Sequence, residues 1–345
     1  MTRTALVTGG AGFIGSALCF ELIEAGWTVT VFDALTYAAA PGTAAALKAA
    51  GVRLIEGDVR DRSAVRAAFD AVRPDAVFHL AAETHVDRSI DAADDFVTTN
   101  VNGTLAVLEA LRARRDADQD APAAPLVHIS TDEVFGALGP EDPPFNEATA
   151  YDPSSPYSAS KAASDHLARA WARTYGLDVR VSNCSNNYGP RQFPEKLIPL
   201  MILNALEGRA LPVYGDGSNR RDWLHVDDHA RALRRIAEAG APGRTYCIGG
   251  GAERSNLEVV RAICAVLDAR RPQTAPHDRL IAFVDDRPGH DWRYAVDAAR
   301  AQAELGWAPR RDFEAGLAET VDWYLEAGAW LAPLAGRYGR ERLGL

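Results

Sequence analysis

The sequence predicts an α/β protein built on a doubly wound parallel sheet. Short β-branched runs alternate with amphipathic segments through the first half of the chain, which is typical of parallel strands covered by helices on both faces. A glycine-rich turn directly follows the first of these runs. The 345 residues, 47% apolar and 24% charged, have a globular composition and enough length for about two domains.

Each expected element has a local signal. Runs rich in Val, Ile and Thr predict strands over Thr4–Thr8, Thr28–Phe32, Arg53–Glu56, Ala76–Leu80, Leu126–Ser130 and Asp178–Ser182. Amphipathic spacing predicts helices over Ser16–Ala25, Ser63–Val72 and Phe96–Arg114, whereas the polar, proline-bounded Arg115–Pro125 reads as a surface loop.

The pattern loosens after Asn183, where Pro, Gly and Asn cluster around Ser185–Pro190. Shorter elements are expected beyond it, namely helices near Glu195–Leu206 and Asp227–Ala239 and a strand near Pro212–Tyr214. We therefore expect a Rossmann-like domain of residues 1–182 plus 222–248. A smaller α/β domain of residues 183–221 plus 249–345 would complete the chain.

The charge balance narrows the classes of partner. The chain has 37 basic and 47 acidic residues, a net charge of −10, which argues against nucleic acid or an anionic membrane as the main partner. The sequence shows no apolar stretch near ~20 residues and no secretion signal at its start. Four cysteines without CxxC spacing fit reduced thiols, so we expect a cytoplasmic protein.

The turn after the first strand predicts a dinucleotide-binding site. Its glycines can be read as G-x-x-G-x-x-G (Gly9, Gly12, Gly15) or as G-x-G-x-x-G starting at Gly10, with the required strand before and helix after. Such glycines let the backbone approach a pyrophosphate at the helix N-terminus. Asp33, which follows the second strand, suits a ribose diol and is followed by no arginine, so NAD is favoured over NADP.

Tyr157 and Lys161 form a candidate catalytic pair. They stand at i and i+4 in a helix that Pro156 would open, and so share one face. A neighbouring ammonium is expected to lower the phenol pKa toward neutrality. Lysine is rare here, since Lys48, Lys161 and Lys196 are the only ones among the 37 basic residues, which singles out positions where an ammonium is needed.

Two adjacent carboxyls follow the strand expected at Leu126–Ser130. The run Thr131-Asp132-Glu133 would lie at the carboxyl end of a buried parallel strand, where side chains face the ligand crevice. Two such carboxyls can act as one acid and one base if their surroundings separate their pKa values. The alternative is that Asp132 caps a short helix and Glu133 is solvated.

These motifs together resemble a known family. GGAGFIG with YSASK is similar to the extended short-chain dehydrogenase/reductases that act on nucleotide sugars. Among them, STDEVFG, SNNYGP, RDWLHVDDH and DDRPGHDWRYAVD resemble the dTDP-glucose 4,6-dehydratases, and the resemblance runs from Thr4 to about Tyr324. Arg191-Gln192 replace a common aromatic–His pair and His225 a common Tyr, which leaves the exact sugar in doubt but not the reaction type.

The resemblance implies a dehydration that begins and ends with NAD⁺, held tightly. Tyr157 would take the proton of the sugar C4 hydroxyl while the C4 hydride passes to NAD⁺. Glu133 would then remove the C5 proton and Asp132 protonate the departing C6 hydroxyl, with Thr131 bonded to the C4 oxygen. Return of the hydride to C6 and of a proton to C5 would give dTDP-4-keto-6-deoxy-glucose from dTDP-glucose.

The resemblance also implies binding residues and a homodimer. Implied cofactor contacts are Gly9, Gly12, Phe13, Ile14, Gly15, Asp33, Ala34, Leu35, Thr36, Asp58, Val59, Leu80, Ala81, Ala82, Thr84, Thr99, Tyr157, Lys161 and Asn187. Implied substrate contacts are Thr84, Thr131, Asn186, Glu195, Lys196, Leu197, Pro212, Val213, Tyr214, Arg221, Asn256, Arg287 and His290. The helices expected at Phe96–Arg114 and Ser158–Thr174 would pair two copies in a four-helix bundle.

Several alternatives stay open. His225 and His229 could imitate a metal pair, but no third ligand is evident and no metal is expected; Asp227 is instead expected to cap a helix. A 4-epimerase, a decarboxylase or a dehydratase of a UDP- or GDP-sugar would share the fold, and thymine differs from uracil by one methyl group. A regulatory or scaffold protein would be expected to lack the catalytic set. A rhamnose pathway and an antibiotic-sugar pathway would use the same enzyme.

Overall fold

The computed structural model describes residues 2–118, 123–286 and 290–334. Its strands are β1 (Thr4–Thr8), β2 (Thr28–Asp33), β3 (Arg53–Glu56), β4 (Ala76–His79), β5 (Leu126–Thr131), β6 (Val179–Cys184), β7 (Asn186–Tyr188), β8 (Leu211–Tyr214), β9 (Arg220–His225), β10 (Thr245–Ile248), β11 (Glu253–Ser255) and β12 (Ile281–Val284). Its α-helices are α1 (Phe13–Glu24), α2 (Pro41–Ala49), α3 (Arg62–Val72), α4 (Val86–Asp91), α5 (Ala93–Phe96), α6 (Gly103–Ala117), α7 (Pro156–Tyr175), α8 (Leu197–Leu206), α9 (Val226–Ala239), α10 (Asn256–Arg270), α11 (Ala299–Leu305), α12 (Phe313–Glu326) and α13 (Gly328–Leu331).

Seven parallel strands form the main sheet, in the order β10-β6-β5-β4-β1-β2-β3. The chain leaves β1 toward β3 on one side and later returns to β4 on the other, so the connections reverse beside β1. Ligands of such sheets bind beyond the carboxyl ends of the strands at that reversal. The Rossmann-like fold is confirmed, and all six strands expected in the first half are present.

Helices cover both faces of this sheet, as the apolar strands require. On one face α9 packs against both α1 and α11, and their core includes Leu18, Leu22 and Ile236. On the other, α3, α6 and α7 pack together around Val107 and Leu111. Strands such as Leu126–Thr131 are buried along their whole length, which explains why they read as continuous apolar runs.

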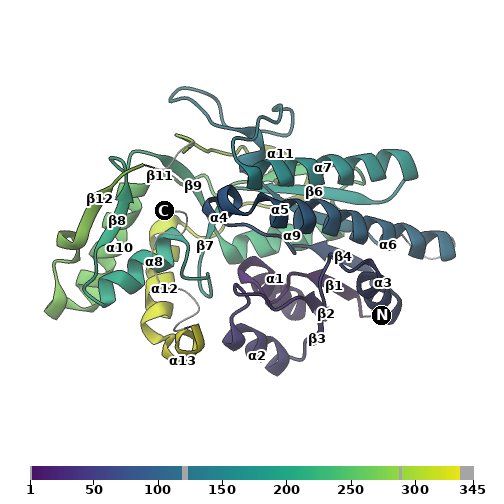
Figure 1. Cartoon of the computed structure of the whole chain (residues 1–345), viewed down its shortest axis with the longest axis horizontal. Coiled ribbons are helices and arrows are strands. Elements are labelled where there is room, and N and C mark those ends of the chain that lie inside the picture. Colours follow the sequence, from purple (N-terminus) through teal and green to yellow (C-terminus); the bar gives the residue numbers. More distant parts are fainter. Residues whose placement is uncertain (1, 119–122, 287–289, 335–345) are drawn as a thin grey trace.

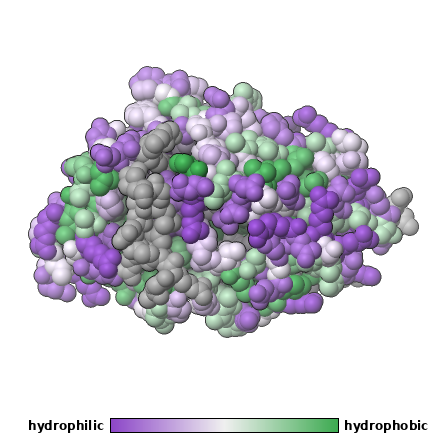
Figure 2. Space-filling model, in the orientation of Figure 1, coloured by the Kyte–Doolittle hydropathy of each residue, from purple (hydrophilic) through white to green (hydrophobic). Residues whose placement is uncertain are grey.

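The remaining elements build two small sheets, β11-β9-β7 and β12-β8. Helices α8, α10 and α12 pack around these sheets in a separate apolar core. In Figure 1 this group lies to the left, away from α6 and α7 on the right. The face in view is mostly hydrophilic with scattered apolar patches (Figure 2). Across the described residues, no helix combines the length and apolarity needed to span a bilayer.

Two local expectations differ from the structure. The segment expected as one helix over Phe96–Arg114 contains a π-helical turn at Val97–Asn102, and α6 follows it. The expected capping of α9 by Asp227 is wrong, because the N-cap is His225, whose Nδ1 accepts a hydrogen bond from the Asp227 N–H. The Asp227 carboxylate instead pairs with Arg311 at 3.0 Å. The backbone geometry sets where a helix starts, and the N-cap of α9 lies two residues before the Asp227 that the sequence suggested.

Candidate active site

A cavity of about 340 Å³ opens where the carboxyl ends of β1, β2, β4, β5 and β6 meet. It brings together the glycine turn, Asp33 and Asp58 with the catalytic candidates Thr131, Asp132, Glu133, Tyr157 and Lys161. Segments far apart in the sequence therefore line one space, as the crevice of a doubly wound sheet requires.

The glycines of the first turn have no room for side chains. A Cβ on Gly15 would lie 2.2 Å from the Gly9 carbonyl oxygen, and one on Gly9, where φ is +70°, would lie 2.6 Å from the Ala81 nitrogen. Gly12 is the N-cap of helix α1, and no side chain caps this end of the helix. The N–H groups of its first turn are therefore left for a ligand on the cavity side. This is the geometry of a pyrophosphate site.

We expect Gly15→Ala to destabilise the protein by about 3 kcal/mol or more, because its Cβ would meet backbone that cannot move aside. The change should also lower the NAD content of the purified protein. Thermal unfolding and cofactor content, measured together, check this. Gly328→Ala is the matched control, since a Cβ there meets nothing within 4 Å. A Gly15→Ala protein with the parent's thermal stability and NAD content would contradict the pyrophosphate site.

Asp33 shapes the cavity beside this turn. Its carboxylate accepts the Ala11 N–H at 2.9 Å and the Leu35 N–H at 2.8 Å. Burial raises its pKa, and the two N–H groups lower it. Among the described residues, the buried Ser130 Oγ and Asn186 Oδ1 atoms of the lining have no hydrogen-bond partner. The glycine turn, the Asp33 carboxylate and these free polar atoms fit a bound dinucleotide.

Thr131, Asp132 and Glu133 leave β5 in a short 3₁₀ turn, Asp132–Phe135. The Thr131 hydroxyl caps that turn by accepting the Glu133 N–H at 3.2 Å, and it donates to Asp132 Oδ1 at 3.3 Å. Asp132 is 2% exposed. Burial, followed by the charges of Glu133 and Asp222, raises its pKa well above the ordinary range, which favours its protonated form.

The expected lowering of the Tyr157 pKa by Lys161 is wrong in this structure. Burial and the charge of Glu133 raise the pKa well above its ordinary value, and the neighbouring Thr131 side chain partly opposes them. The Lys161 ammonium instead donates to the Ile129 carbonyl at 2.8 Å. The i,i+4 spacing places both residues on one face of α7 but does not fix the direction of the long lysine side chain.

The π-helical turn at Val97–Asn102 fixes the cavity wall between β4 and α7. Asn100 accepts the Glu83 N–H at 2.8 Å and donates to the Glu83 carbonyl at 3.0 Å. Its amide also donates to Ser160 of α7 at 2.9 Å. The loop carrying Ala82 and Thr84 is thereby held against the catalytic helix.

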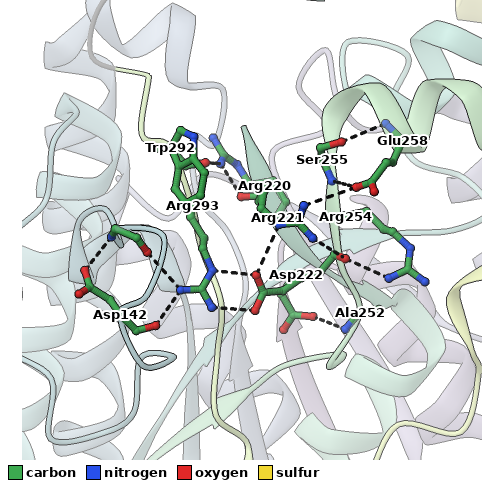
Figure 3. Close-up of polar contacts among 12 residues, drawn as sticks. Asp142, Arg220, Arg221, Asp222, Ala252, Arg254, Ser255, Glu258, Trp292 and Arg293 are labelled. Carbon is green, nitrogen blue, oxygen red and sulfur yellow. Dashed lines mark hydrogen bonds and ion pairs between the residues drawn. The ribbon is translucent and has the colours of Figure 1, made fainter. Parts of the chain in front are cut away.

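Arg293 ties the smaller sheets to the loop that follows the carboxyl pair. Its guanidinium makes two bonds of 2.8 Å to the Glu253 carboxylate and one of 2.8 Å to the Asp142 carbonyl. Figure 3 shows it reaching from beside Trp292 toward the Asp142 loop. Asp222 nearby accepts the Ala252 N–H at 2.8 Å. These contacts brace one side of the turn that holds Asp132.

Several expected substrate residues lie outside the cavity lining, in or beside the small sheets. Tyr214 and His290 meet there, with ring centroids 5.8 Å apart. Arg221 donates to the carbonyl of Asp291 at 2.9 Å. Arg287 lies outside the described residues. The expected residues that do not line the cavity are Leu35, Leu197, Pro212, Val213, Tyr214, Arg221, Asn256 and His290.

Other residues line the cavity that the sequence did not single out. They are Phe32, Ala38, Ala39, Gly57, Arg60, Ile129, Ser130, Cys184, Ser185, Gln192 and Phe193. A simple signal was available for some of them, because Ser130, Cys184 and Ser185 stand at or directly after the carboxyl ends of buried strands. Gln192 was noted in the sequence as a departure from the family pattern but not as a cavity residue.

The sequence and the fold match known proteins along nearly their whole lengths. The chain matches the GDP-mannose 4,6 dehydratase family over residues 6–320. It is 56% identical to a probable dTDP-glucose 4,6-dehydratase of Sinorhizobium fredii, over 99% of this chain and 98% of that one. It is 53% identical to the dTDP-glucose 4,6-dehydratase of Neisseria meningitidis, over 99% of both. The Streptomyces venezuelae dTDP-glucose 4,6-dehydratase, solved with NAD and dTDP bound, has a TM-score of 0.87 and 43% identity, covering 96% of this chain and 99% of that chain.

Proposed function

The chain belongs to the dTDP-glucose 4,6-dehydratases of the extended short-chain dehydrogenase/reductase family, and from this membership we propose that it converts dTDP-glucose to dTDP-4-keto-6-deoxy-glucose and water. The enzyme is an NAD-dependent hydro-lyase. The observation that carries the reaction type is the carboxyl pair Asp132–Glu133 in the same cavity as Tyr157. Dehydration needs an acid and a base besides the group that serves oxidation, whereas epimerisation at C4 does not.

We assign the proton transfers to three side chains. Tyr157 receives the proton of the C4 hydroxyl, a role for which the positive nicotinamide ring of bound NAD⁺ would have to offset the burial and the Glu133 charge that raise its pKa. Oxidation at C4 then makes the C5 proton acidic. Glu133 removes the C5 proton, and a proton goes back to C5 when the hydride returns to C6. Asp132 gives its proton to the C6 hydroxyl as water leaves, and its raised pKa supports this role because the acid must enter the step protonated. The different surroundings of the two carboxyls thus support the separation of acid from base.

The cofactor is NAD, held by the glycine turn at its pyrophosphate and by Asp33 at its adenosine ribose. When bound, it accepts the C4 hydride and returns it to C6, so no net oxidation occurs. The carboxylate of Asp33 would repel a 2′-phosphate, and the next residues are Ala34 and Leu35, which offer no positive charge to offset it.

We propose that the two domains expected from the sequence bind different molecules. Residues 1–182 plus 222–248 bind NAD, and residues 183–221 plus 249–345 bind the sugar nucleotide. Glu195 and Lys196 lie where the two parts meet at the cavity, and Lys196 Nζ donates to the Thr84 carbonyl at 3.1 Å. The substrate contacts outside the lining, including Tyr214, Arg221 and His290, remain part of this proposal.

A homodimer in the cytoplasm completes the proposal. Helices α6 and α7 pack side by side, which supports pairing of two copies through a four-helix bundle; a light-scattering mass of one chain would refute it. All four cysteines are buried and free, which supports a reducing compartment.

The deciding experiment incubates the purified protein with dTDP-glucose and no added cofactor, followed by mass spectrometry. We expect the sugar nucleotide to lose one water with no net formation of NADH. Conversion of a UDP- or GDP-sugar alone would keep the mechanism and change the nucleotide. A product of unchanged mass would indicate an epimerase and leave Asp132–Glu133 with a structural role.

A further inference from the structure

We propose that His229 is a positioning residue for the cofactor, acting through Asn187. His229 lies on α9, behind the cavity, and does not line it, whereas Asn187 on β7 does. The inference rests on the proposed contact between Asn187 and NAD. It gives a role to a histidine that otherwise has none in the reaction.

The contacts of Asn187 fix which way its amide faces. Its Nδ2 lies 2.9 Å from the Ser185 carbonyl oxygen, and because a carbonyl only accepts, this amide atom must be the donating nitrogen. Its Oδ1 therefore faces the Nδ1 of His229, 2.9 Å away. The Asn187 backbone carbonyl is held as well, by the Gln192 amide at 2.9 Å.

The same geometry determines the tautomer of His229. The ring is fully buried, and burial lowers its pKa to about 3, so it is neutral and carries one N–H. Since the Asn187 Oδ1 can only accept, that N–H must be on Nδ1. Among the described residues the buried Nε2 has no partner, which agrees with a nitrogen that carries no hydrogen.

Asn187 is thus held at three points, by Ser185, His229 and Gln192. Its Nδ2 also lies 3.5 Å from the Cys184 sulfur, and Cys184 lines the cavity together with Tyr157 and Lys161. The amide therefore stands at the reacting end of the cavity rather than at the adenosine end near Asp33. Without the His229 donor, the Asn187 side chain could rotate and its contact with the cofactor would weaken.

The test measures the rate at which NAD leaves the holoenzyme, in the absence of substrate, for a set of variants. His229→Leu removes the donor, and His229→Asn keeps an N–H close to the place of Nδ1. His225→Asn is the matched control, because His225 also lies at the start of α9 but bonds the Asp227 N–H, and asparagine preserves that cap. Asn187→Ala and the double variant with His229→Leu complete a cycle.

We expect about tenfold faster release of NAD from His229→Leu, the effect of one buried hydrogen bond, and release close to the parent rate from His229→Asn and His225→Asn. The double variant should release NAD no faster than Asn187→Ala. If the leucine variant does not fold, His229→Gln, which moves the donor away from Nδ1, takes its place.

Parent-like release from the leucine variant, release from His229→Asn as fast as from leucine, or multiplying effects in the double variant would each overturn the proposal. Because the assay involves no sugar nucleotide, failure to dehydrate dTDP-glucose would not alter these outcomes. The two proposals therefore fail separately.

Discussion

Glu133→Gln is expected to lower the turnover of dTDP-glucose by roughly 10²- to 10⁴-fold, the usual contribution of a general base. The amide cannot take the C5 proton, but Tyr157 and the cofactor site are unaltered, so oxidation at C4 still occurs. Reduced cofactor should therefore accumulate on the enzyme after substrate is added. Its near-ultraviolet absorbance, followed alongside the loss of water, checks both expectations.

The matched control is Glu24→Gln at the exposed end of α1, which should leave turnover unchanged. Full turnover by Glu133→Gln would remove Glu133 from the mechanism. Loss of turnover with no accumulation of reduced cofactor would assign Glu133 to the oxidation step or to substrate binding instead.

Tyr157→Phe should also lower the turnover of dTDP-glucose by roughly 10²- to 10⁴-fold, but the step that stops should be a different one. Without the phenolic oxygen nothing receives the C4 hydroxyl proton, so oxidation itself should stop and no reduced cofactor should appear. Rapid-mixing absorbance with dTDP-glucose distinguishes this variant from Glu133→Gln. The smaller side chain fills almost the same buried volume, so unfolding temperature should change little.

Tyr175→Phe provides the control, because Tyr175 ends the same helix and does not line the cavity. Accumulation of reduced cofactor in Tyr157→Phe would show that another group receives the C4 proton. The Lys161 ammonium and the Thr131 hydroxyl would then be the next candidates, since both line the cavity.

Much of the fold and site could be predicted because the signals are local. The glycines at 9, 12 and 15 lie within one turn, and Gly9 and Gly15 are required by contacts with neighbouring backbone. The strands are continuous apolar runs because both faces of the sheet are covered. The carboxyl pair and the Tyr157–Lys161 spacing are likewise short motifs, and the cavity brings them together.

Predictions failed where distant residues compete for the same group. The Lys161 ammonium was expected beside Tyr157 but bonds Ile129 of β5, 32 residues away in the chain. The cap of α9 was assigned to Asp227, whose carboxylate pairs with Arg311 instead. Gln192 drew no attention as a cavity residue, because its place depends on how the segment after β7 folds back.

The sequence by itself determined the fold class, the dinucleotide cradle and the identity of the groups available for proton transfer, since each depends on residues close together in the chain. Only the tertiary structure decided the state of those groups. The pKa of Asp132 is raised because burial and the charges of Glu133 and Asp222 act on it together. The Tyr157 pKa is raised rather than lowered, and the Asn187 amide is oriented from α9. Burial and long-range contacts set pKa values and amide orientations, and neither is written in local spacing.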